Sequence, residues 1–338
     1  MSRNRPAFLS FASGTSPGVS AASETGLVNG DSNKLPMLTR PVTMRNNITA
    51  FLGEFVGTFL FLFFAFAGTQ VANTPAPSGT LPDGSPAPPN LLAVLFISLA
   101  FGVSLTANVW AFYRVTGGLF NPCVTLALAL VGGLPALRSG IVVVAQLLAG
   151  IAAAGIVSGL FPGPLTVETG LGGGASTAQG LFIEMFLTAE LVFVIIMLAA
   201  EKHKGTYLAP VGIGTAFFLT ELTGVYFTGG SLNPARSLGP AVVNGHFPPY
   251  FWIYFIGPIL GALLASGFYA LLKYLRWKEC NPGQDWSDIE AAERERRAGG
   301  AVDEEGGGLE RRESRGKNAT VHEVQPQGGS SGNGLLAD

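Results

Sequence analysis

Two copies of one short pattern carry the clearest chemical signal in this 338-residue sequence. Residues 116–123 read TGGLFNPC and residues 228–235 read TGGSLNPA, so both copies, here called box one and box two, share T-G-G-x-x-N-P. Asparagine is a favoured helix N-cap and proline is favoured at the first helical position. Each box therefore predicts a helix start whose amide side chain also offers N–H donors to a small polar molecule. The residues concerned are Asn121, Pro122 and Cys123 in box one, and Asn233, Pro234 and Ala235 in box two.

The apolar run after each box is too short to cross a membrane. The runs cover residues 124–130 and 237–243, and a helix of about ten residues rises only ~15 Å, half of a ~30 Å bilayer core. Two such half-helices, entering from opposite faces, would meet at their N-termini. Their positive dipole ends would repel cations and protons, and a water molecule bonded to both asparagines would be unable to relay a proton. One box alone is more often a plain helix start, but two copies in matching halves favour this paired site.

Several charged residues lie inside apolar stretches, where a charge is costly and usually functional. Arg236 would repel cations and donate hydrogen bonds to a solute in a pore, unless its side chain extends to the interface. Glu54 and Glu184 lie in the same Glu-x-x-x-Thr pattern in the two halves. They are either proton relays or acceptors for the backbone amides of the neighbouring box, and their symmetry favours the second role. The role of Glu190, which has no counterpart in the first half, is open.

The composition is that of a polytopic membrane protein. Hydrophobic residues make up 48% of the chain and charged residues only 12%, whereas soluble domains are about a quarter charged. The net charge of −2 predicts no nucleic-acid partner. We expect no enzyme chemistry, no bound cofactor and no metal.

Six apolar segments are long enough to span a bilayer. Each half holds three spans, an odd number, so the second half must be inverted relative to the first. Inverted repeats with broken helices place their site at the midplane. The predicted spans are 48–71, 91–110, 140–160, 180–200, 207–227 and 250–272. We expect a disordered N-terminal tail at 1–46, a channel domain at 47–275 with repeats at 47–160 and 180–275, and a disordered C-terminal tail at 276–338.

The distribution of basic residues predicts the orientation. The loops at 72–90 and 161–179 contain no Lys or Arg, while the N-terminal tail and residues 273–278 are basic. Both termini are therefore expected in the cytoplasm.

These features resemble the aquaporin, or major intrinsic protein, family. The resemblance rests on the six spans, the duplicated box, the Glu-x-x-x-Thr pattern and the NPARS sequence at 233–237, and it covers about residues 48–275. The flank FYRVTGG at 112–118 is similar to fungal members. The resemblance implies an all-α fold of six transmembrane helices and two re-entrant half-helices, assembled as a homotetramer with one pore per subunit.

The resemblance also implies a selectivity filter of four residues. Counting back from the two asparagines places Phe101 and Glu221 in it, and the loop after the fifth span supplies Gly230 and Arg236. The bulky Phe101, and Ser237 where glycerol channels carry Asp, are similar to the water-selective branch. Glu221 is the largest departure, since water channels usually have His there, and Gly230 removes side-chain bulk.

Three placements of Glu221 are open. In the first, the Glu221 carboxylate pairs with Arg236 and could occlude the pore. In the second, the carboxyl group stays neutral and both donates and accepts hydrogen bonds. In the third, the side chain turns away from the pore. The count places it in the pore.

The first functional hypothesis is a passive channel for water, with hydrogen peroxide as a second solute of similar size. The alternatives are a channel for glycerol or ammonia, a coupled transporter or gated channel that uses Glu221, and a non-conducting scaffold. The expected partners are water, small neutral solutes and the bilayer of the plasma membrane or an internal membrane. In the C-terminal tail, the sequence RRES at 311–314 resembles a kinase site and predicts phosphorylation of Ser314.

Overall fold

A computed structural model describes residues 42–74 and 90–281, together with residues 293 and 296. In this part of the chain six helices are long and apolar enough to cross a membrane. They are α1 (Val42–Ala72), α2 (Leu91–Phe112), α4 (Ala136–Leu160), α5 (Thr177–Ile195), α6 (Ala209–Thr228) and α8 (Ile253–Tyr274), and a π-helical segment, Ile196–Ala200, continues α5 to the end of its span. The six-span prediction is confirmed.

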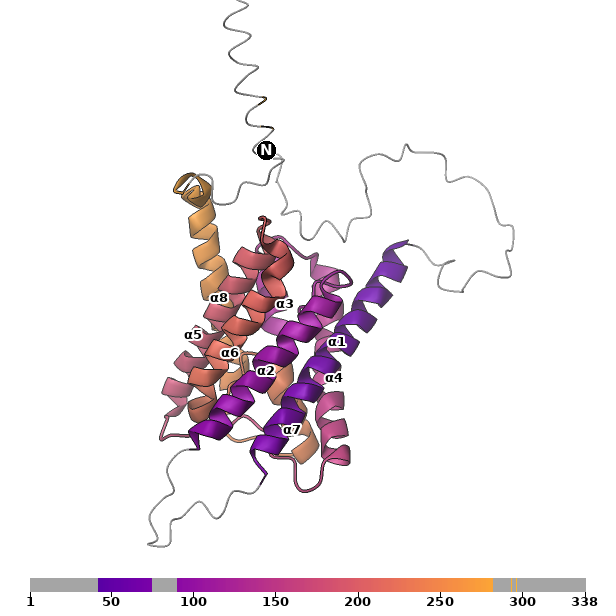
Figure 1. Cartoon of the computed structure of the whole chain (residues 1–338), viewed down its shortest axis with the longest axis vertical. Coiled ribbons are helices and arrows are strands. Elements are labelled where there is room, and N and C mark those ends of the chain that lie inside the picture. Colours follow the sequence, from indigo (N-terminus) through magenta and orange to yellow (C-terminus); the bar gives the residue numbers. More distant parts are fainter. Residues whose placement is uncertain (1–41, 75–89, 282–292, 294–295, 297–338) are drawn as a thin grey trace, which may run out of the picture. The chain divides into compact units, whose positions relative to one another are not determined.

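The two short helices are α3 (Pro122–Leu130) and α7 (Pro234–Asn244), labelled toward opposite ends of the bundle in Figure 1. Each begins as its box predicts. The side-chain oxygen of Asn121 accepts the backbone N–H of Cys123 at 2.8 Å, and that of Asn233 accepts the N–H of Ala235 at 2.9 Å. The proline at the first helical position loses nothing, because its missing N–H would have no partner in the helix.

Close packing of α4 against α7 depends on glycine. A Cβ on Gly150 would lie 2.3 Å from the carbonyl oxygen of Ala235, and a Cβ on Gly239 would lie 2.3 Å from the carbonyl oxygen of Gly150. Small residues at helix contacts are typical of membrane bundles, since they let backbones approach. Here they hold the second half-helix against a full span.

The ends of the channel domain differ slightly from the prediction. Helix α1 begins at Val42, so residues 42–46, which we expected in the N-terminal tail, are helical. The Arg138 guanidinium donates to Asn47 Oδ1 at 3.0 and 3.1 Å and holds this polar first part of α1 against α4. Residues Trp277–Glu279, expected in the C-terminal tail, form a 3₁₀ turn. Residues 276, 280, 281, 293 and 296 of the C-terminal tail are also described, and the rest of both predicted tails, including Ser314, lies outside the described residues.

Glu201 links the end of the fourth span to the end of α8. Its carboxylate accepts hydrogen bonds from Tyr269 Oη and Lys273 Nζ, and Lys278 Nζ lies 3.1 Å from Oε2. Burial alone would favour the protonated form, but these three donors outweigh it and hold the pKa of Glu201 below its ordinary value of 4.5. The cluster therefore anchors the start of the C-terminal tail to the bundle.

This depressed pKa predicts a pH-dependent contribution to stability. A carboxyl whose pKa is lower in the folded state stabilises the fold at pH values above its unfolded pKa, and that contribution is lost as the pH falls through the folded pKa. We expect the melting temperature of the wild type to exceed that of Glu201→Gln at pH 7. The gap should narrow below about pH 4.5, measured on purified protein in detergent. A gap that stays constant down to pH 3.5 would contradict the linkage.

Candidate functional site

The two boxes are joined by a reciprocal pair of hydrogen bonds, here called the cross-brace. Asn121 Nδ2 donates to the carbonyl oxygen of Leu232 at 2.8 Å, and Asn233 Nδ2 donates to the carbonyl oxygen of Phe120 at 2.9 Å. Phe120 and Leu232, the residues before the two asparagines, have φ values of 49° and 52°. Such left-handed backbone is costly for a residue with a side chain and is concentrated at functional sites. It turns each carbonyl toward the opposite asparagine.

Each asparagine keeps one amide N–H for a further partner. A primary amide has two N–H donors, and the cross-brace uses one on each residue. The side-chain oxygens of the two asparagines cap the N-termini of α3 and α7. The positive ends of both half-helices therefore face the same point. The arrangement can bind the oxygen of a small polar molecule while it repels cations.

Two buried carboxylates hold the box loops in shape. Glu54 accepts the backbone N–H groups of Leu119 and Phe120 at 3.1 and 2.9 Å, and Gln146 Nε2 donates to it at 2.9 Å. Glu184 accepts the N–H groups of two box-two residues, Ser231 and Leu232, at 3.0 and 2.8 Å. These are the hydrogen bonds that the symmetric Glu-x-x-x-Thr patterns led us to expect.

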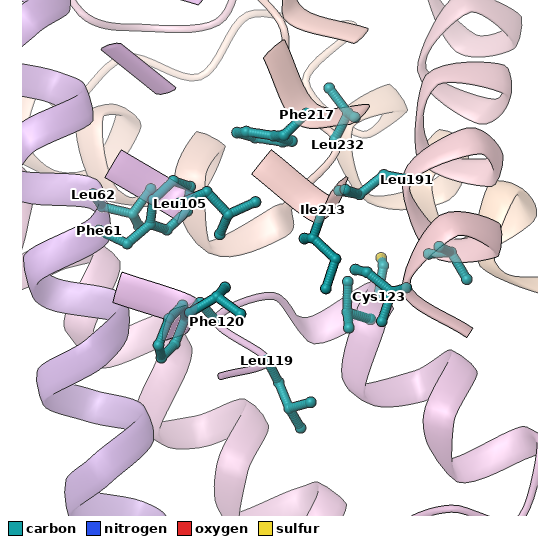
Figure 2. Close-up of a cluster of buried hydrophobic side chains, with 14 of the residues drawn as sticks. Phe61, Leu62, Leu105, Leu119, Phe120, Cys123, Leu191, Ile213, Phe217 and Leu232 are labelled. Carbon is teal, nitrogen blue, oxygen red and sulfur yellow. The ribbon is translucent and has the colours of Figure 1, made fainter. Parts of the chain in front are cut away.

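A narrow apolar cavity adjoins the two asparagines and has room for about one water molecule, ≈ 10 Å³. Helices α2 and α6 line it with residues one turn apart, Leu105 and Val109 on α2, and Ile213 and Phe217 on α6. Figure 2 shows several of the side chains around it, which come from different helices. Besides Asn121 and Asn233, the lining residues are Phe61, Leu105, Val109, Gly118, Leu119, Phe120, Val124, Leu191, Ile195, Ile213 and Phe217.

The four predicted filter positions lie near one another in space. The two on α2 and α6 lie on the same helix faces as the residues that line the cavity. Helix α6 is α-helical throughout, so Glu221 lies one turn beyond Phe217 on the same face. Phe101 lies one turn before Leu105 on α2, and the Arg236 guanidinium carbon is 5.0 Å from the centre of the Phe101 ring. Phe101 and Glu221 therefore lie within regular α-helical segments.

Arg236 is held by backbone carbonyls. Its Nε donates to Gly230 at 3.0 Å, one terminal nitrogen donates to Val167 at 2.6 Å, and the other donates to Gly229 at 3.3 Å. Sequence reasoning missed the contribution of Val167, because a main-chain acceptor leaves no side-chain signature. The ion pair with Glu221, one of the three placements that the sequence left open, is not formed, since no protein atom of the described residues hydrogen-bonds to that carboxyl group.

The Glu221 carboxyl occupies the space that a side chain at position 230 would fill. A Cβ on Gly230 would lie 2.0 Å from Glu221 Oε2. Glu221 is fully buried, and so is Phe101, while Arg236 is 1% exposed. The absence of a side chain at Gly230 therefore does not widen this region, contrary to the simple reading of the sequence.

Comparison with known proteins identifies the family. A family model described as Major intrinsic protein matches residues 42–269, more than half of the chain. The chain belongs to the major intrinsic protein family. Aquaporin-7 of Botryotinia fuckeliana (strain B05.10) is 61% identical over 71% of this chain and 53% of its own length. Probable aquaporin-3 of Gibberella zeae (strain ATCC MYA-4620 / CBS 123657 / FGSC 9075 / NRRL 31084 / PH-1) is 50% identical over 71% of this chain and 82% of its own.

The aquaporin-like fold is also seen in a solved structure. The X-ray structure of the aquaglyceroporin from Plasmodium falciparum is similar with a TM-score of 0.56 at 22% identity, covering 66% of this chain and 95% of that one. This major intrinsic protein spans about half the length of several curated relatives that it matches. It is an integral membrane protein of a family of passive channels, not of enzymes.

Two remaining predicted residues lie away from the cavity of this major intrinsic protein. Cys123 is 1% exposed and does not line the cavity, so its thiol packs as the small apolar residue that the position requires. Glu190 is exposed on the outer face of α5, turned away from the two boxes.

Proposed function

We propose that this protein is a passive channel for water that excludes protons and ions. The observation that carries the proposal is the pair of capped half-helices, α3 and α7, whose cross-braced Asn121 and Asn233 each keep one free amide N–H at the same point. A water molecule that accepts both N–H groups has its own hydrogens directed away from its neighbours in file. The two positive helix ends add an electrostatic barrier to cations.

In this proposal Phe101, Glu221, Gly230 and Arg236 form the selectivity filter. Because all four residues are buried, this region has no room for a solute larger than water. Hydrogen peroxide is close to water in size and hydrogen bonding, so we include it as a second solute. Glycerol fits less well, because the carboxyl of Glu221 fills the space beside Gly230.

A coupled transporter or ion channel is the second class considered, and the residues that it would need serve other purposes. Glu184 has its oxygens committed to the backbone of box two, and Glu190 lies on the outer face. The remaining acid, Glu221, is a single group next to Arg236. A passive pore therefore fits the arrangement better than a relay of carboxylates.

We further propose a homotetramer with one pore per subunit in the plasma membrane or an internal membrane, with both termini in the cytoplasm. The absence of Lys and Arg from the loops at 72–90 and 161–179 supports this orientation.

The test is stopped-flow light scattering of proteoliposomes after an osmotic step. We expect fast shrinkage with a low activation energy for the wild type and for Glu221→His, because water passes either side chain. Slow shrinkage in the wild type that becomes fast in Glu221→His would mean that the acid closes the filter. If both variants are inserted and folded yet shrink at the rate of protein-free lipid, the water-channel proposal fails.

A further inference from the structure

Three consecutive residues of the loop between α4 and α5 contact helix α7. Val167 accepts a hydrogen bond from Arg236 through its carbonyl, and Thr169 donates from Oγ1 to Ser237 Oγ at 3.0 Å. Glu168, between them, points to the other end of α7. Its Oε1 accepts Asn244 Nδ2 at 2.7 Å, and its Oε2 lies 2.9 Å from His246 Nδ1.

The loop is therefore hydrogen-bonded to both ends of the second half-helix, α7. Arg236 is near the N-terminus of α7, and Asn244 is the last residue of that helix. Asn244 Nδ2 also donates to the carbonyl oxygen of Leu165 at 3.0 Å, so the loop has two attachments at the C-terminal end. Because Val167 and Glu168 are joined by one peptide bond, holding the Glu168 side chain restricts the movement of the Val167 carbonyl.

The Glu221 carboxyl, beside Gly230, is a second acceptor near Arg236. The Glu221 carboxyl is fully buried, and neither of its oxygens has a hydrogen-bond partner among the described residues. Buried polar groups are usually paired, and a guanidinium bonds most strongly to a carboxylate. Arg236 donates to the Val167 carbonyl at 2.6 Å and makes no hydrogen bond to this carboxyl, although the charges of Arg236 and Glu221 interact.

We propose that Glu168 is a positioning residue that keeps Arg236 on the Val167 carbonyl and off the Glu221 carboxyl, so that the filter stays passable. Loss of the Glu168–Asn244 contact frees the loop, and the guanidinium then crosses the filter to Glu221 and blocks it. This inference rests on the proposed water channel. It adds a role for the α4–α5 loop that the filter residues alone do not contain.

The test uses Glu168→Ala, Asn244→Ala and Glu168→Gln in proteoliposomes of wild-type-like protein content. We expect Glu168→Ala and Asn244→Ala to lower osmotic water permeability about tenfold. Glu168→Gln should recover a large part, because its amide oxygen still accepts Asn244 Nδ2. The decisive variant is Glu168→Ala combined with Glu221→Ala, which should conduct like Glu221→Ala alone, because the competing acceptor is gone.

Gln179→Ala is the matched control. It removes the hydrogen bond that Gln179 Oε1 accepts from the backbone N–H of Ser176 at 2.8 Å, at the α5 end of the same loop, and leaves the loop residues that contact α7 unchanged. A merely structural role for Glu168 predicts low permeability that Glu221→Ala does not restore, and this result would overturn the proposal. Unchanged permeability in both Glu168→Ala and Asn244→Ala would overturn it as well. A wild type that does not conduct water would count against the proposed function and not against the positioning role. In that case the position of Arg236 in a structure of Glu168→Ala would test the positioning role.

Discussion

Glu184→Gln is expected to destabilise the folded channel by about 4 kcal/mol, the largest single-residue effect on stability that we predict. The fully buried carboxylate accepts two backbone N–H groups of box two. A hydrogen bond to a charged group contributes about 1.5–3 kcal/mol, and an unsatisfied buried donor costs about 1–3 kcal/mol. Glutamine has one acceptor oxygen, and its NH₂ group would face the second backbone N–H.

The measurement is the thermal unfolding of purified protein in detergent. For a domain of this size, 1 kcal/mol shifts the melting temperature by roughly 2–4 °C, so the loss should be roughly 10 °C. Glu190→Gln is the matched control, because it makes the same chemical change on the same helix at an exposed position. If Glu184→Gln has the same melting temperature as the Glu190→Gln control, the Glu184 carboxylate does not hold the loop of box two.

The half-helices and their supports could be predicted because their signals are local or duplicated. An Asn-Pro start followed by a short apolar run depends on neighbouring residues alone. The equivalence of Glu54 and Glu184 followed from the repeat, and repetition marked both as loop supports. The positions of Phe101 and Glu221 could be counted because α2 and α6 keep a regular helical register up to the boxes.

The contacts that the sequence did not reveal are long-range and involve the main chain. The cross-brace joins Asn121 to Leu232 and Asn233 to Phe120, residues more than a hundred positions apart. It needs positive φ at two residues that carry side chains, a conformation that no residue-type rule predicts for Phe or Leu. The Val167 carbonyl is a similar case. The sequence showed that Gly230 lacks side-chain bulk, but it did not show that the Glu221 carboxyl fills the space beside it.

Gly230→Ala is the change from which we expect the largest loss of water flow. A Cβ at position 230 would lie 2.0 Å from Glu221 Oε2 and 2.8 Å from its Cδ. The carboxyl must move, and in the proposed channel its new position lies in the filter, because Glu221 is a predicted filter residue. We expect a fall in osmotic permeability of at least about tenfold. Left-handed backbone at φ 61° adds about 1–2 kcal/mol of strain for alanine.

Two further variants separate the steric effect from this strain. Gly245→Ala places the same methyl group at φ 65°, where nothing lies within 4 Å, so it carries the strain without the clash and should conduct like the wild type. Gly230→Ala combined with Glu221→Ala should conduct like Glu221→Ala alone, because the obstructing carboxyl is absent. If the double variant is as slow as Gly230→Ala, the methyl group acts through the backbone of box two. The Glu221 carboxyl would then not be the group that closes the pore.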